Sequence, residues 1–480
     1  MHPRMLHLFC SLLFAIAGMA CAAPVPIADF VQRPEAGVPH LSPDGAHLAI
    51  RINLADGLYG LRVIRLADMQ TVSLLKMPRH DLPGRIFWVD DQRLLIEKAQ
   101  QSGSLDEPEP TGELISTRLD GTEQSYLYGY FNQEDSLRTR AKGRDRGFVS
   151  VIDVPLPHDG SVLVSVLPFD NRKVSLAYRL DAKSGAKREI ARIGTPGLAF
   201  LADASGAVRI AYGIDEETLK RSVYVRDDAE AQWRRLDAAA IGEEFLPLSF
   251  APDGKRVYAH YSAKGEPKAL VLATPVNAER EVLARDPEAD VWGTLSAGRP
   301  ATPHAAVFLP GRPRTVYLDD RRNEARLHEA LSRKFPDEFT SLIDFGADGT
   351  RVLMGVSSDR DPGAYYLFDA KAKTIRKLVG VLPAIDPLRM GERRPVRIEA
   401  RDGTALHAIL TLPPGREAKD LPLVLNPHGG PYEVADDWFF DTDAQLLASR
   451  GYAVLQVNFR GSGGSGPGFR KAGYREWGGR

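Results

Sequence analysis

The chain has 480 residues, of which 43% are apolar and 26% charged, and its formal net charge at neutral pH is −1. This composition is typical of a globular protein, and the length is compatible with two unequal domains as well as with three. Since there is no basic excess, the chain lacks the electrostatic footprint of a nucleic-acid-binding protein, and short peptides or small molecules are the expected partners.

Residues 1–22 have the pattern of a secretory signal. Arg4 precedes an apolar run, and small residues with A-x-A spacing end at Ala22. The sequence therefore predicts cleavage after Ala22, export across the inner membrane and a periplasmic location. The alternative is a lipoprotein attached through Cys21, which Gly18 disfavours because an aliphatic residue is usual at that position.

The cysteines and histidines argue against metal and thiol chemistry. Both cysteines, Cys10 and Cys21, lie in the signal, so the mature chain is expected to have no disulfide, cysteine nucleophile or thiolate metal site. The eleven histidines form neither a His-x-x-x-His pair nor an H-E-x-x-H motif. No metal or cofactor is predicted. No other segment has about 18 consecutive apolar residues, so no stable membrane span is predicted.

Residues 30 to 385 consist of short β-type runs that turns separate. Alternating apolar residues and many β-branched residues predict half-buried antiparallel strands. The clearest runs are HLAIRINL (47–54), YGLRVIRL (59–66), RLLIEKA (93–99), SVLVSVLPF (161–169), RVYAHYS (256–262) and RVLMGVSS (351–358).

A weak repeat lies on this pattern. LSPDGAHLAI, FAPDGKRVYAH and FGADGTRVLMG each place Asp-Gly before a strand, with the aspartates at Asp44, Asp253 and Asp348. Asp-Gly suits a tight turn because glycine tolerates positive φ and the aspartate bonds nearby amides. Asp253 and Asp348 are 95 residues apart, about two units of 47, and the first two aspartates are 209 apart, between four and five units. Residues 88–97 and 201–213 look like degenerate copies.

A period of about 40 to 50 residues with four strands per unit is that of a β-propeller. The region assigned to this domain, residues 23–385, would hold about seven blades. A β-sandwich array whose Asp-Gly turns recur by chance is the alternative. The acidic run that contains Glu216 and Glu217 is interpreted as a solvated loop tip, with substrate anchoring as the less favoured interpretation.

Residues 386–480 have a different pattern. Residues 393–415 predict two strands around an Asp-Gly turn, and the apolar run that begins 421–430 predicts a strand buried on both faces of a sheet. Residues 441–451 predict a helix with a polar N-cap and a glycine stop. A second buried strand is expected in 452–461. A strand, a helix and a strand in this order predict the N-terminal part of an α/β domain, incomplete within these residues.

The chemistry-bearing stretch follows the first of these buried strands. His428, Gly429 and Gly430 form a loop in which side chains are nearly absent and backbone N–H groups can turn toward a ligand. Donors fixed in this way stabilise the charge that develops on a carbonyl oxygen. In α/β-hydrolases a loop at this place supplies half of the oxyanion hole. Alone, the motif is weak, because glycines in a loop need only indicate a tight turn.

Four runs in the same order carry a family resemblance. They are the stretch from His428 to Pro431, SRGYAV (449–454), NFRGS (458–462) and the ending AGYREWG. This segment resembles the prolyl oligopeptidase family of serine peptidases, in its acylaminoacyl-peptidase and dipeptidyl-peptidase-like branches. The resemblance is close over residues 395–480, and the propeller-like region before it fits the same architecture.

The resemblance implies a seven-bladed propeller capping an α/β-hydrolase domain, and hydrolysis of short peptides through an acyl-enzyme. It also implies oxyanion donation from Gly429 and Gly430, with His428 shaping the loop. The next loop, in which the serines of RGSGGSGPG are interpreted as part of a flexible turn, would line the substrate site.

Three residues of that next loop are candidates for contact with substrate: Asn458, Phe459 and Arg460. For Arg460, bracing the fold is as compatible with the pattern as touching substrate.

No serine of the chain lies in the G-x-S-x-G elbow that exposes a nucleophile between a strand and a helix. Ser462 has Arg460 two residues before it, and Ser465 has Pro467 two residues after it. By resemblance, the elbow, the acid and the base are expected beyond Arg480.

His428 is expected to face no serine and so cannot serve as the base. We therefore expect the chain by itself to be inactive, as a truncated product or an incomplete record of a full enzyme. The strand YAVLQVNF is expected to expose an apolar edge.

Two other functions remain open. One is a non-catalytic propeller that binds peptides or proteins, and the other is an α/β-hydrolase esterase, motivated by His-Gly-Gly alone. Pro431, where esterases favour another glycine, and the long β region weigh against the esterase. The peptide specificity, the exo-, endo- or dipeptidyl mode and the oligomeric state stay open.

Overall fold

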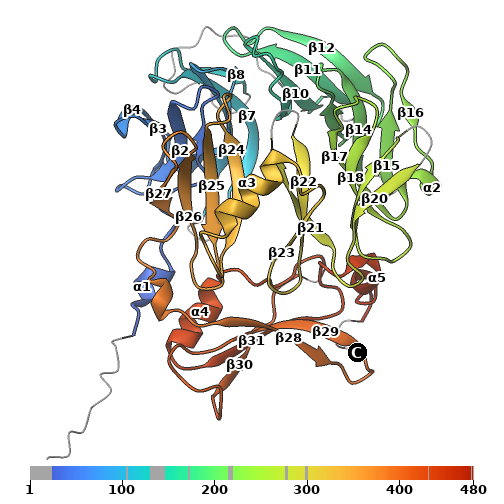
Figure 1. The fold of residues 1–480 in the computed structure, drawn as a ribbon. Helices are drawn as coiled ribbons and strands as arrows, with labels where there is room; N and C mark the ends of the chain where they lie inside the picture. The colour runs from blue at the N-terminus through green and yellow to red at the C-terminus, as the bar shows by residue number, and fades with distance from the viewer. Residues whose placement is uncertain are drawn as a thin grey trace, which may run out of the picture.

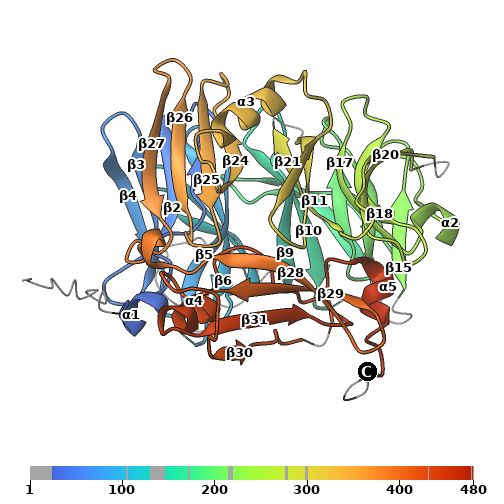
Figure 2. The same cartoon turned by 60° about the horizontal axis from the view of Figure 1, so that its bottom comes forward.

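A large β domain lies above a smaller α/β domain in the computed structural model (Figures 1 and 2). The described residues are 24–103, 106–129, 146–170, 173–214, 220–275, 279–297, 301–430, 432–476 and 478. The signal with Cys10 and Cys21, the pair Glu216 and Glu217, and Pro431 lie outside them. Within these ranges, no helix has the length and apolar character needed to cross a membrane.

Seven antiparallel sheets follow one another in the described part of the large domain. Each sheet is formed by strands consecutive in sequence, as in a propeller blade. The first four sheets contain β1 (His40–Leu41), β2 (His47–Asn53), β3 (Tyr59–Arg65) and β4 (Gln70–Lys76); β5 (Asp81–Trp88), β6 (Arg93–Gln100), β7 (Glu109–Arg118) and β8 (Ser125–Tyr128); β9 (Gly147–Asp153), β10 (Ser161–Pro168), β11 (Ser175–Asp181) and β12 (Lys187–Ile193); and β13 (Ala199–Ala202), β14 (Val208–Ile214), β15 (Arg221–Val225) and β16 (Arg234–Arg235).

The last three sheets contain β17 (Glu244–Phe250), β18 (Val257–Ser262), β19 (Ala269–Ala273) and β20 (Arg280–Ala284); β21 (Val291–Ala297), β22 (Thr302–Phe308) and β23 (Arg314–Tyr317); and β24 (Phe339–Phe345), β25 (Arg351–Ser357), β26 (Ala364–Asp369) and β27 (Thr374–Gly380). The short helices α2 (Ala238–Ile241) and α3 (Asn323–Ser332) lie in connections between sheets. The six strands predicted from the clearest runs are confirmed as β2, β3, β6, β10, β18 and β25.

The first and last of these sheets contact each other. The Leu41 amide donates to Asp344 Oδ2 at 3.1 Å, and the Ala347 amide donates to the Pro43 carbonyl at 2.6 Å. A cluster of buried apolar residues, among them Leu48 and Leu353, fills the space between the two sheets. The order of sheets is therefore closed by the contact between its ends.

The Asp-Gly repeat occupies one place in the sheets. Asp44, Asp253 and Asp348 each lie in the turn between the first and second strands, and each side chain accepts a hydrogen bond from an amide two residues later. The glycines that follow them have φ values of 65 to 68°, which glycine adopts without strain. The turns belong to the first, fifth and seventh sheets, so the separations of 209 and 95 residues correspond to four and two sheets.

Two histidines are buried between β22 and α3. His304 is 0% exposed, and neither of its ring nitrogens has a hydrogen-bond partner among the described residues. Its ring centroid is 6.0 Å from that of His328, which contacts the Tyr317 hydroxyl at 2.7 Å and the Thr340 carbonyl at 2.8 Å. Burial, followed by the neighbouring His328, lowers the pKa of His304 to about 4.

This burial predicts a loss of stability in mild acid. The pKa of His304 is lowered from 6.5 to about 4 in the folded protein. Between these two pH values the unfolded chain binds a proton that the folded protein does not, so the free energy of unfolding falls as the pH drops from 6.5 toward 4. Replacing His304→Leu should reduce the fall in unfolding free energy between pH 7 and 5 by about 2 kcal/mol. Urea unfolding measures it, with the exposed His80→Asn as control. Equal pH dependence of wild type and His304→Leu would contradict the prediction.

The smaller domain is one four-stranded sheet with three helices near it. The sheet order is β28 (Arg393–Glu399), β29 (Ala405–Thr411), β31 (Ala453–Asn458) and β30 (Leu423–Leu425), with β30 and β31 parallel. The 3-10 helix η1 (Pro387–Arg389) precedes the sheet, α4 (Thr442–Ser449) connects β30 to β31, and α5 (Gly466–Lys471) follows β31. The helix predicted in 441–451 is confirmed, and Asp441 caps it by accepting from the Ala444 amide at 2.8 Å.

Two predictions about this sheet are wrong. β30 is one of the two edge strands, and its side chains Leu423 and Leu425 are 59% and 62% exposed rather than buried on both faces. The strand YAVLQVNF, which forms β31, is paired on both sides and has no open edge. An apolar run predicts a buried strand, but it does not specify which strand lies at the edge of the sheet.

The N-terminal segment packs on the smaller domain. Helix α1 (Ile27–Phe30) contacts α4, and Arg450 Nη2 donates to the Val25 carbonyl at 2.7 Å. Phe30 and Val25 share a buried cluster with Met390. The beginning of the described chain is thus held against α4 of the smaller domain.

Candidate active site

Three contacts fix the ring of His428. Its Nε2 lies 2.7 Å from Ser462 Oγ, its Nδ1 lies 2.6 Å from the Gly429 carbonyl oxygen, and the ring stacks on Phe459 with centroids 4.5 Å apart. A carbonyl oxygen can only accept, so Nδ1–H is the donor to Gly429 and Nε2 accepts from the Ser462 hydroxyl. The ring has one tautomer and one orientation in this arrangement.

The expectation that His428 faces no serine is therefore wrong. The loop after β31 folds back beneath the histidine, where the Glu433 amide donates to the Gly461 carbonyl at 3.0 Å. His428 and Ser462 are 34 residues apart. Nothing in the spacing of the motifs shows that their loops meet.

The contact between His428 and Gly429 sets the direction of the next amide. The peptide bond between Gly429 and Gly430 is trans, so its C=O and N–H point in opposite directions. Since the Gly429 oxygen faces the histidine ring, the Gly430 N–H points away from it. Among the described residues, neither the Gly429 nor the Gly430 amide has a hydrogen-bond acceptor. A Cβ added at Gly429 would meet nothing within 4 Å, so the loop borders open space.

Ser462 does not have the environment of a nucleophile. Its side chain is 0% exposed, and its amide donates to the Phe459 carbonyl at 2.9 Å within a tight turn. A carbonyl carbon of a substrate has no access to its Oγ. The other ring nitrogen of His428 is used on a backbone carbonyl, whereas a triad orients its base with a carboxylate. The pair therefore positions the loop.

Asn458 and Arg460, two of the three residues predicted to line the site, bond to neighbouring parts of the smaller domain. Asn458 is 5% exposed; its Oδ1 accepts from the Asp436 amide at 2.8 Å and its Nδ2 donates to the Asp436 carbonyl at 2.9 Å. Arg460 pairs with Asp402 and donates to Thr404 Oγ1 at 2.8 Å. For Arg460 the structure thus shows the bracing contact, at the turn between β28 and β29.

Arg393 is a residue that sequence reasoning missed. It is 2% exposed, and its guanidinium donates to the Gln456 side chain at 2.9 Å and to the Asp437 carbonyl at 2.7 Å. Burial raises the pKa of the carboxyls of Asp437 and Asp436. The only signal in the sequence is an arginine at the start of a strand, which is common on surfaces.

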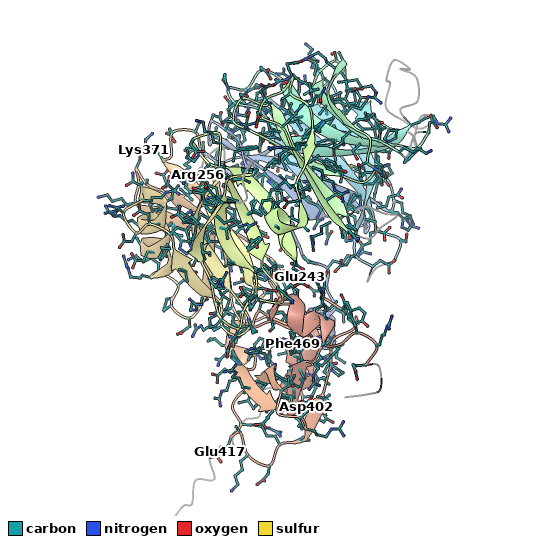
Figure 3. All side chains as sticks on the ribbon, turned by 90° about the vertical axis from the view of Figure 1, so that its right-hand side faces the viewer. Glu243, Arg256, Lys371, Asp402, Glu417 and Phe469 are labelled. Atoms are coloured by element: carbon teal, nitrogen blue, oxygen red, sulfur yellow. The ribbon has the colours of Figure 1, made fainter. Side chains whose placement is uncertain are left out.

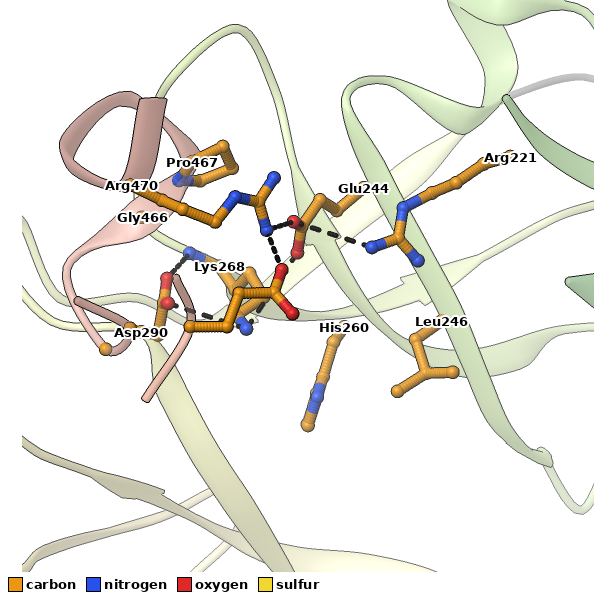
Figure 4. Close-up of a pocket in the computed structure, with 12 residues that line it drawn as sticks. Arg221, Glu244, Leu246, His260, Lys268, Asp290, Gly466, Pro467 and Arg470 are labelled. Atoms are coloured by element: carbon orange, nitrogen blue, oxygen red, sulfur yellow. Dashed lines mark hydrogen bonds and ion pairs between the residues drawn. The ribbon is translucent and has the colours of Figure 1, made fainter. Parts of the chain in front are cut away.

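A cavity of about 260 Å³ separates the fifth sheet from the glycine-rich loop after Ser462 (Figure 4). Arg470 of α5 pairs with Glu433 and, at 2.8 Å, with Glu244 of the propeller, while Lys268 lies 3.5 Å from Asp290. Figure 3 shows Glu243, which pairs with Lys471, beside the helix that carries Phe469. The cavity thus lies where the two domains are tied together.

His260 forms part of the cavity wall. Burial, followed by the charge of Lys268, lowers the pKa of His260 to about 4, so the ring is neutral at neutral pH. Within the ranges that the structure covers, no group of three histidine, cysteine or acidic residues could hold a metal ion.

The comparisons with known proteins agree with this architecture. The sequence model of the Prolyl oligopeptidase family matches residues 438–480. Dipeptidyl aminopeptidase BIII of Pseudoxanthomonas mexicana is 29% identical over 355 residues, which are 69% of this chain and 48% of that protein. The chain thus spans about half the length of this relative.

Two solved structures share the fold. A prolyl endopeptidase structure is 16% identical with a TM-score of 0.60, and the match covers 93% of this chain and 65% of that chain. Puromycin hydrolase is 17% identical with a TM-score of 0.56, and the match covers 94% of this chain and 70% of that chain. The likeness concerns the arrangement of propeller and hydrolase domains.

Proposed function

The chain belongs to the prolyl oligopeptidase family of serine peptidases, and on this premise we propose that it supplies the substrate-binding propeller and the oxyanion loop of a peptidase that cleaves short peptides through an acyl-enzyme. We propose that the seven sheets are the seven blades, that residues 23–385 form the propeller domain and that residues 386–480 form part of the peptidase domain. We also propose that the signal at residues 1–22 directs the protein to the periplasm.

The observation that carries the proposal is the outward Gly430 amide. Its peptide plane is held by the bond between His428 Nδ1 and the Gly429 carbonyl, and the amide has no acceptor among the described residues. A donor fixed before the reaction stabilises an oxyanion without reorganisation, and losing one such donor typically costs about 3 kcal/mol in the transition state.

The proposal assigns no serine nucleophile within residues 1–480. These residues contain no G-x-S-x-G elbow, and Ser462 is buried. Absence of a triad serine lowers turnover by a factor of roughly 10⁶. We therefore expect no peptide turnover by this chain alone and no covalent adduct with a fluorophosphonate. An adduct on Ser462 would contradict the proposed division of roles.

The loop itself is tested by the binding of product-like ligands. A dipeptide with a free carboxylate places an anionic oxygen where the acyl oxygen would develop charge, whereas the dipeptide amide places a neutral oxygen there. Since charge-assisted hydrogen bonds are about twice as strong as neutral ones, the carboxylate form should bind about tenfold more tightly. Isothermal titration of the chain with both ligands measures the ratio. Equal affinities would contradict the proposed oxyanion loop.

A further inference from the structure

A second cavity, of about 500 Å³, lies at one end of the first two sheets of the large domain. Its wall is formed by the loop between β2 and β3, the loop between β4 and β5, the residues that follow β6, and Arg33 of the segment after α1. It shares no residue with the cavity of Figure 4. Its volume is in the range of sites that bind small molecules.

The wall of this second cavity carries two cations that are not neutralised. In the part of the chain that the structure describes, neither Arg33 nor Arg79 has a carboxylate within ion-pair distance. The arginine and lysine side chains around the cavity of Figure 4, by contrast, are all paired with acidic ones. The wall of the second cavity has one carboxylate, Asp56, whose Oδ1 accepts from the Leu58 amide at 3.2 Å. Two guanidinium groups and one carboxylate leave a net positive charge, which favours an anionic ligand.

The loop that carries Arg79 is held in one conformation. His80, the next residue, has a φ of 71°, which is uncommon for a residue other than glycine. Its carbonyl accepts from the Gln101 amide at 2.9 Å, and its Nδ1 lies 3.2 Å from the Gln101 carbonyl oxygen. The Tyr59 hydroxyl bonds in turn to the Gln101 side chain. Backbone conformations of this kind cluster where a loop holds a ligand.

Different contacts hold Arg33 beside the same cavity. Asn53 Nδ2 donates to the carbonyl of Pro34 at 2.7 Å, which fixes the residue that follows Arg33. The guanidinium of Arg33 lies 5.5 Å from the centroid of the Tyr59 ring, at a distance typical of a cation–π contact. Two like charges fixed around one cavity repel each other, and an anion between them removes that repulsion.

The wall favours an organic anion over a bare inorganic ion. Guanidinium groups bind both carboxylate and phosphate through paired N–H donors. A single group of either kind would fill only a small part of about 500 Å³. Leu54, Leu58 and Tyr59 give the wall an apolar part, which can contact the rest of a ligand.

We propose that this second cavity is a binding site for a small organic anion, whose carboxylate or phosphate group is held by Arg33 and Arg79 and whose apolar body contacts Leu54, Leu58 and Tyr59. The site goes beyond the proposed peptidase function and does not depend on it. A neutral molecule of the same shape would leave both guanidinium groups without a counter-ion and would bind more weakly.

The test uses three ligands that share a phenyl ring and differ in their charged group. Phenyl phosphate, benzoate and the neutral benzamide are titrated calorimetrically into the wild type, Arg33→Gln and Arg79→Gln. Arg234→Gln is the control, because Arg234 is an exposed arginine on β16, the outer strand of the fourth sheet. Far-ultraviolet circular dichroism checks that each variant is folded.

The wild type should bind at least one of the two anions about tenfold more tightly than benzamide. Arg33→Gln and Arg79→Gln should each remove most of that preference, and Arg234→Gln should keep it. Tighter binding of phenyl phosphate identifies a phosphate ester as the ligand class, and tighter binding of benzoate identifies a carboxylate. A wild type that prefers neither anion to benzamide, or an unchanged preference in either Arg33→Gln or Arg79→Gln, would overturn the inference.

Discussion

Replacing Arg393→Ala should lower the free energy of unfolding by about 3 to 5 kcal/mol, because it leaves several buried hydrogen-bond acceptors without a donor and each such loss costs about 1 to 3 kcal/mol. The guanidinium is 2% exposed and joins the Thr411 and Gln456 side chains to the Asp437 carbonyl. Its removal leaves buried acceptors without a donor and frees the segment that follows the His428 loop. Urea unfolding followed by circular dichroism measures the change.

The neighbouring Arg394→Ala is the matched control. Arg394 pairs with Glu392 at the surface, where its side chain is 51% exposed. Exposed pairs of this kind contribute about 0 to 1 kcal/mol, so this variant should unfold nearly as the wild type does. Similar losses in the two variants would show that Arg393 has no special role in holding the site.

Replacing Gly429→Leu should weaken binding of a dipeptide carboxylate more than about 100-fold, because the new side chain would occupy the space in front of the Gly430 amide and leave no room for the ligand. The backbone of Gly429 does not have a positive φ, and a Cβ there meets nothing within 4 Å, so the fold tolerates the change. Calorimetric titration measures the affinity.

Gly194→Leu controls for the chemistry of the substitution. Gly194 also lacks a positive φ and also has open space around an added Cβ, but it lies in the propeller, between β12 and β13. This variant should bind the dipeptide as the wild type does. Retained binding by Gly429→Leu would mean that the open space beside the loop is not the ligand site.

Much of the fold follows from local chemistry that a sequence displays directly. The Asp-Gly turns at Asp44, Asp253 and Asp348 could be placed because aspartate, glycine and strand alternation act within a few residues. The cap at Asp441 is local in the same way. The burial of β30 was mispredicted because the position of a strand in its sheet depends on which segments pair with it, and a run of apolar letters does not specify its partners.

The residues of the candidate site also differ in how far the sequence alone reveals them. His428, Gly429 and Gly430 were found because glycines beside a strand end are visible in one short segment. The contact with Ser462 was missed, as was Arg393, because each depends on two or more segments that the fold brings together. Contacts of this kind leave no periodicity or spacing in the sequence.

The central claim is that the Gly430 amide is a preset donor for an anionic oxygen, and one nuclear magnetic resonance experiment tests it directly. Labelling glycine with both carbonyl ¹³C and ¹⁵N gives HNCO signals only from Gly-Gly pairs, of which the sequence has three, ending at Gly430, Gly464 and Gly479. Gly430→Ala assigns the signal of interest. Saturation with a dipeptide carboxylate should shift the Gly430 amide proton downfield, and an unmoved Gly430 signal at saturation would contradict the account.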